Sequence, residues 1–214
     1  EFTLSTKNIQ TKDFSWTTDF IFSYSKTKVT DLQTNSKVID LVSGTGFALE
    51  GYPVRGLFSY KFNGLSDKGY PVITDQNGNV TSSGEDIDFQ SQNLDNLVYE
   101  GPSDPTTTGS FGNIFKYKNF RLNVFITYSF GNVVRLDPVF KEKYTDLTAM
   151  PKEFKNRFVQ AGDENITDIP VILTNAQVTR DNYLKTLYNA YNYSTARVAK
   201  GDFIRMKEIS LSYD

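Results

Sequence analysis

Phe120-Arg-Leu-Asn-Val-Phe-Ile-Thr-Tyr-Ser-Phe130 is the stretch of sequence that decides the fold. Its even-numbered positions all carry apolar or aromatic side chains, whereas polar side chains occupy four of the five odd-numbered positions. A period of two is typical of a β-strand with one apolar face. Eleven residues at about 3.3 Å each, tilted by roughly 40°, span about 27 Å, close to the apolar band of about 25 Å on a membrane β-barrel. The stretch therefore predicts a strand long enough to cross a bilayer.

The residues just before this stretch predict its partner strand, at 109–117. Lys118 and Asn119 can form a two-residue turn, although Asn119 tolerates the positive φ of such a turn better than Lys118 does. In that register the apolar face continues across both strands through three pairs: Tyr117 with Phe120, Phe115 with Leu122, and Phe111 with Ile126. A slip of one residue would move every one of these aromatic rings to the other face.

The start of the chain predicts a second pair of strands, at 2–10 and 14–24. The second strand alternates cleanly, with Phe14, Trp16, Thr18, Phe20, Phe22 and Tyr24 on one face. A three-residue turn at 11–13 places Phe2 opposite Phe22 and Leu4 opposite Phe20, whereas a two-residue turn would put these pairs on opposite faces. The longer turn is therefore expected.

A fifth strand is expected at 203–213, and the order of the turns predicts the topology. Membrane barrels keep short turns on the periplasmic side and long loops outside. Both tight turns, at 11–13 and 118–119, then lie on the inner side, and residues 25–108 and 131–202 form two large outer loops. A compact soluble domain rarely needs two connections of that size.

Composition excludes several classes of site. The chain of 214 residues has no cysteine and no histidine, which removes Ser-His-Asp and Cys-His nucleophiles, disulfides, and zinc sites built from these residues. Its formal net charge of -2 gives no reason to expect a nucleic acid partner. No run reaches the roughly 18 apolar residues of a membrane-spanning helix, so any spanning elements must be strands. No cofactor, metal ion or catalytic residue is predicted.

Aromatic residues are unusually frequent, with seventeen Phe and thirteen Tyr, and they gather at both ends of the predicted strands. Membrane barrels place aromatic girdles at both interfaces. Such residues also fill the core of a β-sandwich, so a secreted, carbohydrate-binding sandwich stays as the alternative. On the barrel interpretation, the lipid-facing residues are Phe14, Trp16, Phe20, Phe22, Phe115, Tyr117, Phe120, Leu122, Val124, Ile126, Tyr128 and Phe130.

The two predicted outer loops contain shorter signals. A strand is expected at 54–62, a hairpin turn at Asn77-Gly78, and a short helix at 151–158 with Pro151 in its first turn. Stacked tyrosines could bind sugar rings or peptides, or could pack one loop against another. The candidate substrate-binding residues on this basis are Tyr188, Tyr191 and Tyr193.

Acidic pairs raise the question of an enzyme. Asp86 with Asp88, or Asp163 with Glu164, could form a glycosidase pair, but nothing in the sequence fixes the separation of their carboxylates. Asp75 begins a run that superficially resembles a calcium loop, yet that loop needs glycine at its sixth position, where Val80 stands. Neither a catalytic nor a metal site is predicted.

Several segments together resemble one family. The run from Tyr191 to Asp214 closely resembles a signature of the SusC/RagA family of TonB-dependent outer-membrane transporters of Bacteroidetes. Five more segments resemble the family in the same order: Lys12-Asp-Phe-Ser-Trp16, Glu50-Gly-Tyr-Pro53, Tyr117-Lys-Asn-Phe120, Tyr128-Ser-Phe-Gly-Asn132 and Ala149-Met-Pro-Lys-Glu-Phe-Lys-Asn-Arg157. The resemblance covers nearly the whole chain.

This resemblance implies an all-β fold, namely part of a large antiparallel transmembrane β-barrel with long extracellular loops, in the bacterial outer membrane. It implies a 22-stranded barrel around an N-terminal plug that imports glycans or peptides, with TonB as energy source and a SusD-like surface lipoprotein as lid. On this basis the chain is expected to be an internal piece of a longer transporter. Its expected partners are the plug and the other strands of that transporter, the lipoprotein, outer-membrane lipid, a glycan or peptide substrate, and TonB through the absent N-terminal part.

Overall fold

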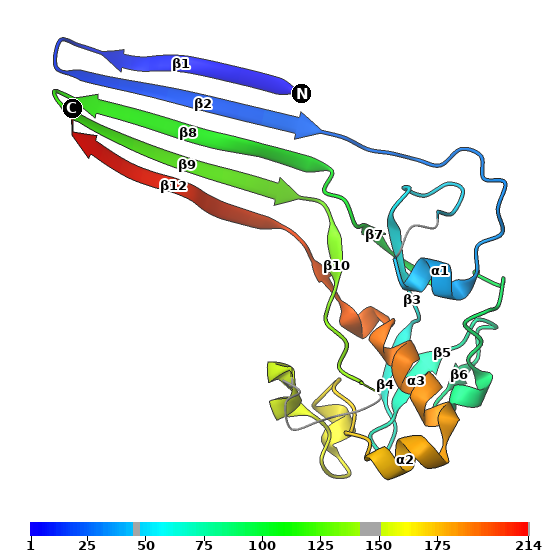
Figure 1. The fold of residues 1–214 in the computed structure, drawn as a ribbon. Helices are drawn as coiled ribbons and strands as arrows, with labels where there is room; N and C mark the ends of the chain where they lie inside the picture. The colour runs from blue at the N-terminus through cyan, green and yellow to red at the C-terminus, as the bar shows by residue number, and fades with distance from the viewer. Residues whose placement is uncertain (45–47, 142–150, 214) are drawn as a thin grey trace. The chain divides into compact units, whose positions relative to one another are not determined.

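The computed structural model describes residues 1–44, 48–141 and 151–213, which divide into two compact units. Unit 1 consists of Glu1–Thr27, Pro102–Val133 and Lys200–Asp214, and unit 2 consists of Lys28–Gly101 and Val134–Ala199. Unit 1 contains the long strands and unit 2 contains the helices and short strands (Figure 1). Each unit is therefore assembled from segments that lie far apart in the sequence.

Unit 1 is a five-stranded antiparallel sheet in the order β1-β2-β8-β9-β12 (Figure 1). Its strands are β1 (Phe2–Gln10), β2 (Phe14–Tyr24), β8 (Thr107–Tyr117), β9 (Phe120–Phe130) and β12 (Phe203–Tyr213). The strand expected at 109–117 begins two residues earlier, at Thr107. Strand β2 pairs directly with β8, and β9 with β12, so the described residues of the intervening segments add no further strand to this sheet.

The strand registers follow the expected pairs. Phe2 lies opposite Phe22 and Leu4 opposite Phe20, as the three-residue turn predicted. The register of β8 and β9 confirms the three predicted pairs, with Tyr117 opposite Phe120, Phe115 opposite Leu122 and Phe111 opposite Ile126. The turn between them is unusual because Lys118 takes the positive φ, 53°. Its backbone N–H donates to the carbonyl of Asp13, 2.8 Å away, which ties the two tight turns together.

Two β-bulges keep the apolar residues of the edge strands on the common face. The register of β1 against β2 shifts between Lys7 and Ile9, so that Ile9 lies opposite Trp16. The register of β12 against β9 shifts between Met206 and Glu208, which preserves the pairing of apolar residues on both sides of the bulge. The sheet is a single layer, since Leu122, Val124 and Ile126 all keep part of their surface exposed. A sandwich would bury these residues beneath a second sheet.

Unit 2 combines short strands with helices. Its N-terminal segment contains α1 (Val38–Val42), β3 (Gly56–Ser59), β4 (Phe62–Leu65), β5 (Pro71–Thr74), β6 (Val80–Thr81), the 3-10 helix η1 (Gly84–Asp86) and β7 (Val98–Pro102). Its second segment contains β10 (Val133–Arg135), the 3-10 helices η2 (Lys152–Asn156) and η3 (Asp163–Asn165), α2 (Asn175–Arg180), α3 (Asn182–Asn192), the 3-10 helix η4 (Thr195–Arg197) and β11 (Val198–Lys200). Strands β7, β10 and β11 extend to the boundaries with unit 1.

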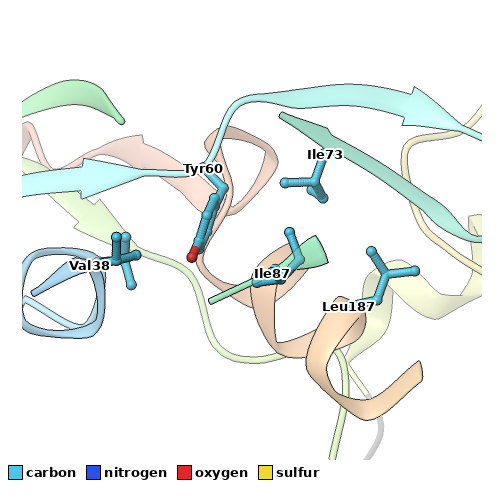
Figure 2. Packing of buried hydrophobic residues seen from close by; sticks show 7 residues of the cluster. Val38, Tyr60, Ile73, Ile87 and Leu187 are labelled. Carbon is cyan, nitrogen blue, oxygen red and sulfur yellow. The ribbon is translucent and has the colours of Figure 1, made fainter. Parts of the chain in front are cut away.

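Both predicted outer loops contribute to one hydrophobic core in unit 2. Val38, Tyr60, Ile73 and Ile87 from the first loop pack with Leu187 from the second (Figure 2). Helix α3 begins at a favourable N-cap, where the Asp181 side chain accepts a hydrogen bond from the Tyr183 N–H at 2.9 Å. Its buried residues recur at helical spacing, so that one face of α3 closes the core.

Three local expectations within unit 2 have different outcomes. The strand expected at 54–62 is divided into β3 and the start of β4, with Tyr60 forming an isolated bridge to Ser194 between them. The Asn77-Gly78 hairpin turn is confirmed between β5 and β6, and Gly78 has a φ of 89°. The helix expected at 151–158 is the shorter 3-10 helix η2, for which Pro151 is the N-cap.

Candidate functional site

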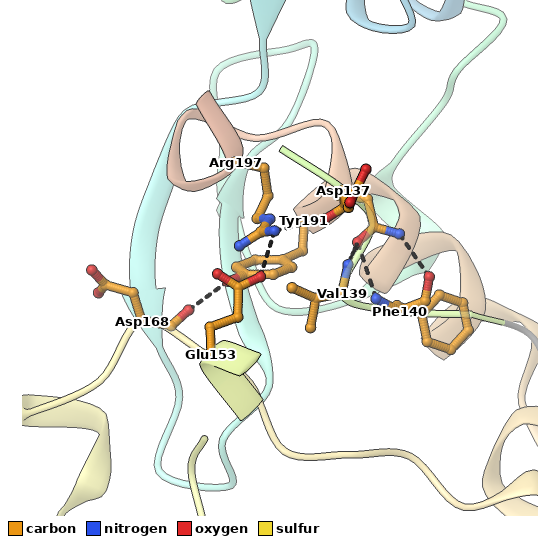
Figure 3. Close-up of polar contacts among 8 residues, drawn as sticks. Asp137, Val139, Phe140, Glu153, Asp168, Tyr191 and Arg197 are labelled. Atoms are coloured by element: carbon orange, nitrogen blue, oxygen red, sulfur yellow. Dashed lines mark hydrogen bonds and ion pairs between the residues drawn. The ribbon is translucent and has the colours of Figure 1, made fainter. Parts of the chain in front are cut away.

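The candidate site lies in unit 2 around Arg197, at the end of the 3-10 helix η4 (Figure 3). Arg197 is 2% exposed, and its Nη2 lies 2.6 Å from Glu153 Oε1 and donates to the carbonyl of Asp137, also at 2.6 Å. A buried guanidinium needs such partners because an unpaired charge in the interior is costly. The Nε of Arg197 is buried without a hydrogen-bond partner among the described residues.

Tyr191 packs beside this ion pair and joins it to the core. Its ring is fully buried and lies edge-on to Phe62, with 5.4 Å between ring centroids. Its hydroxyl donates to the carbonyl of Asp168 at 2.8 Å. Burial raises the pKa of Tyr191, so its hydroxyl stays protonated and serves as a donor. The buried ring of Tyr191 therefore connects the surroundings of Arg197 to Phe62 in the core.

Asn192 binds the irregular segment that follows β10. Its Oδ1 accepts hydrogen bonds from the backbone N–H groups of Val139 and Phe140, at 3.0 and 3.2 Å, and its Nδ2 donates to the carbonyl of Phe140 at 3.1 Å. These three bonds provide partners for backbone N–H and C=O groups of Val139 and Phe140 (Figure 3). They hold residues 139–140 against the end of α3.

Two open hollows flank η2, and both are lined by Pro151, Lys152 and Lys155. The first, which we call the Arg197 hollow, has a volume of about 600 Å³ and includes Arg197, Glu153 and Asp137. The second, the Phe154 hollow, has a volume of about 390 Å³ and adds Phe154, Arg157 and Ile172. Its lining contains three cations and no acidic residue. The lining of the Arg197 hollow combines three cations, Lys152, Lys155 and Arg197, with the two carboxylates.

Arg135 is a second, partly buried arginine in unit 2, and groups of the chain itself surround its terminal nitrogens. Its guanidinium donates to Ser59 Oγ and to the carbonyls of Ser194, Val42 and Phe58, at 2.7 to 3.0 Å. Burial lowers the pKa of Arg135 to about 10, so the side chain stays charged at neutral pH. Arg135 therefore joins α1 and β3 to Ser194, the second residue after α3.

The three tyrosines predicted to bind substrate lie at the C-terminal end of α3 and just beyond it. Tyr188 is 2% exposed and donates to the carbonyl of Val171 at 2.6 Å, while Tyr191 is buried beside Arg197. Tyr193 is partly exposed, and its ring lies 5.9 Å from the Arg135 guanidinium carbon. Tyr188 and Tyr191 thus pack loop against loop, and a direct contact of any of the three with substrate stays a prediction.

The residues predicted to face lipid share one face of the unit 1 sheet. The register brings Phe14, Tyr117, Phe120 and Tyr213 into a row across four strands at the end with the tight turns. Near the other end, Tyr128 crosses over Gly109, and its hydroxyl donates to the carbonyl of Ile21 at 2.9 Å. All twelve predicted residues are on this face, which also carries apolar residues of β1 and β12. Their contact with lipid stays a prediction.

Sequence reasoning missed the cations around η2. Lys152, Lys155 and Arg157 stand within six residues, which is the one local signal that could have drawn attention to them. Arg197 lies 40 to 45 positions further along the chain, so only the fold brings it beside them. The acidic pairs have local structural roles instead: Asp163 accepts the N–H groups of Val159 and Gln160, and Asp88 accepts that of Gln90.

Residues 1–44, 48–141 and 151–213 contain neither a cluster of metal ligands nor a helix suited to spanning a membrane. No group of three or more acidic, histidine or cysteine side chains could hold a metal ion in this part of the chain. Asp75 instead accepts the N–H groups of Asn77 and Asn79 within the hairpin turn. None of the helices described has the length and apolar character needed to span a membrane.

The comparisons with known proteins agree with the architecture. No family model matches the chain. It is 27% identical over 256 residues to TonB-dependent receptor P39 of Formosa agariphila, and 25% identical over 228 residues to TonB-dependent receptor P3 of the same organism. Both alignments cover the whole chain but only 23% and 21% of the relatives, so the chain spans about a quarter of their length or less.

Solved structures have the same fold. A structure of the RagAB peptide transporter matches with a TM-score of 0.66 at 20% identity, over 99% of this chain and 22% of that chain. Structures of the RagAB peptide importer in the open-open and closed-closed states match with TM-scores of 0.65 and 0.63, at 17% and 19% identity, over 99% of this chain and 21% and 22% of those chains. The chain thus has the fold of a segment of a TonB-dependent receptor β-barrel. Within that class, the resemblance to the SusC/RagA type is confirmed.

Proposed function

We propose that the chain is part of an outer-membrane importer that takes up a glycan or a peptide with energy from TonB. In this proposal unit 1 supplies five strands of the barrel wall, and unit 2 is the folded outer part formed by the two long loops. The transporter has no chemistry of its own, and no residue of this chain acts as a catalyst. The observation that carries the proposal is the continuous apolar face of a single-layered sheet with one strand of nine residues and four of eleven.

The two faces of the sheet suit a barrel wall. Aromatic side chains stand at both ends of the apolar face, as in the girdles of membrane barrels. The opposite face of β9 carries the polar residues Arg121, Asn123, Thr127 and Ser129, which suit the water-filled interior of a barrel. Lipid takes the place that a second sheet has in a sandwich, and the plug and substrate pathway lie on the polar side.

The edges of the sheet identify the nearest partners. Strands β1 and β12 each pair with one neighbour in the described part of the chain, so each has a free edge. Unpaired backbone groups are not tolerated in hydrocarbon. We therefore expect both edges to pair with further strands of the same transporter. A SusD-like lipoprotein above unit 2 and TonB on the periplasmic side complete the proposed assembly.

Cysteine labelling in cells tests the orientation. This chain has no cysteine of its own, so a single cysteine can be placed at Ile166, which is 82% exposed in unit 2, or at Asn119 in a tight turn. The parent background is a full-length receptor in which any cysteine elsewhere has been replaced by serine. A membrane-impermeant maleimide should label the Ile166→Cys receptor on intact cells and the Asn119→Cys receptor only after lysis. The reverse pattern would reject the proposed orientation. Deleting the parent gene should also abolish growth on the imported nutrient.

A further inference from the structure

We propose that the two hollows beside η2 bind an oligomer that carries carboxylate groups on successive units. This inference rests on the proposed importing function and adds a substrate class to it. Both hollows lie within unit 2, and their shared wall is formed by Pro151, Lys152 and Lys155. A ligand that filled both would contact the two lysines from either side.

Charge is the first argument. Lys152, Lys155 and Arg157 are exposed, and none of them has an ion pair with another described residue. In the Arg197 hollow, Glu153 and Arg197 neutralise each other, which leaves Lys152 and Lys155 against the single carboxylate of Asp137. The hollows therefore concentrate positive charge on a chain whose formal net charge is -2. Such a local excess attracts anions and raises their local concentration.

The lining also distinguishes an organic anion from an inorganic ion. The Phe154 hollow has apolar walls from Pro151, Phe154 and Ile172 beneath its cations. A sugar ring or the aliphatic part of an acidic side chain can pack on such walls while its carboxylate reaches a lysine. A bare phosphate or sulfate ion would leave this apolar surface uncovered.

Two adjacent hollows favour an oligomer over a single small acid. Their volumes, about 600 and 390 Å³, are each in the range of small-molecule sites. Because they share Lys152 and Lys155, successive acidic units could occupy both and be bound together, which gains affinity without new kinds of contact.

The test measures binding of four probes to the purified full-length receptor: trigalacturonate, galactotriose, triglutamate and triglutamine. At least one acidic probe should bind about tenfold or more tightly than its neutral counterpart, with an advantage that declines as salt rises. Preferential binding of trigalacturonate would identify the ligand as an acidic glycan, and preferential binding of triglutamate would identify it as an acidic peptide. Equal binding of the acidic and neutral members of both pairs would overturn the inference.

Variants test the location. The double variant Lys152→Glu with Lys155→Glu should reduce the affinity for the preferred acidic probe by about tenfold or more. The double variant Lys152→Gln with Lys155→Gln removes the two charges without reversing them and should reduce this affinity less. Lys68→Glu is the matched control, because Lys68 is exposed in unit 2 and lines neither hollow. Unchanged binding by both double variants would overturn the inference. If the receptor imports oligomers but binds acidic and neutral probes equally well, this inference is wrong and the proposed importing function is unaffected.

Discussion

Trp16 and Asn113 are 97 positions apart, yet the indole Nε1 of Trp16 donates a 2.8 Å hydrogen bond to Asn113 Oδ1 on the apolar face of the sheet. Thr18 Oγ1 donates to the same oxygen, also at 2.8 Å, and receives a bond from Asn8 at the β1 bulge. A polar cluster thus crosses three strands on an otherwise apolar face. In hydrocarbon these groups would have no water to bind, so the mutual hydrogen bonds make the cluster tolerable there.

Removing the Asn113 side chain should therefore destabilise the sheet. Asn113→Ala leaves the Trp16 N–H without an acceptor and should cost about 1 to 3 kcal/mol of unfolding free energy in the full-length receptor. Trp16→Phe removes the donor and keeps an aromatic ring. A double-mutant cycle of the two changes should give a coupling energy of about 0.5 to 1.5 kcal/mol, and additivity within about 0.3 kcal/mol would show that the bond contributes nothing.

Gly84 provides a prediction for the packing of unit 2. A Cβ at this position would overlap the carbonyl oxygen of Tyr183, a backbone atom of α3 that cannot move aside cheaply. Gly84→Ala should therefore cost about 1 to 3 kcal/mol and increase hydrogen exchange in α3. Gly56→Ala is the control, since its Cβ would meet its nearest neighbours at 3.2 to 3.4 Å. Equal effects of the two substitutions would count against the close contact of η1 with α3.

Arg135 should be irreplaceable by lysine. An ammonium group cannot reproduce the planar set of bonds to Ser59, Ser194, Val42 and Phe58. Arg135→Lys should cost about 2 to 4 kcal/mol, measured as faster hydrogen exchange of residues 38–42 and 56–59 in the full-length receptor. Arg157→Lys, an exposed change in the same unit, should leave this exchange unaltered. Protection that survives Arg135→Lys would contradict the role given to the guanidinium.

The unit 1 sheet was predictable because its information is local. Each strand carries its own alternation, and the turns at 11–13 and 118–119 fix the register of their hairpins. The two bulges were not predicted, since one extra residue in an edge strand leaves no clear mark in a pattern of period two. The positive φ of Lys118 also ran against residue preference, and the hydrogen bond from its N–H to Asp13 accompanies it.

Unit 2 was far less predictable because its core is assembled over long distances. Val38 and Leu187 meet in one cluster although nearly 150 residues separate them, and no local pattern encodes that contact. The same applies to Arg197 and Glu153. Tyrosines near the end of α3 suggested a binding surface, but amphipathic helix spacing turns Tyr188 and Tyr191 inward. Side-chain type alone could not distinguish those two roles.

The direction of the apolar face is the central claim, and arginine scanning of β9 in a lipid bilayer tests it most directly. If Val124 and Ile126 face lipid near mid-depth, Val124→Arg and Ile126→Arg should each reduce the unfolding free energy of the full-length receptor by about 2 to 4 kcal/mol. Asn123→Arg, on the polar face, should cost less than about 1 kcal/mol. Equal tolerance of arginine on the two faces would contradict the account.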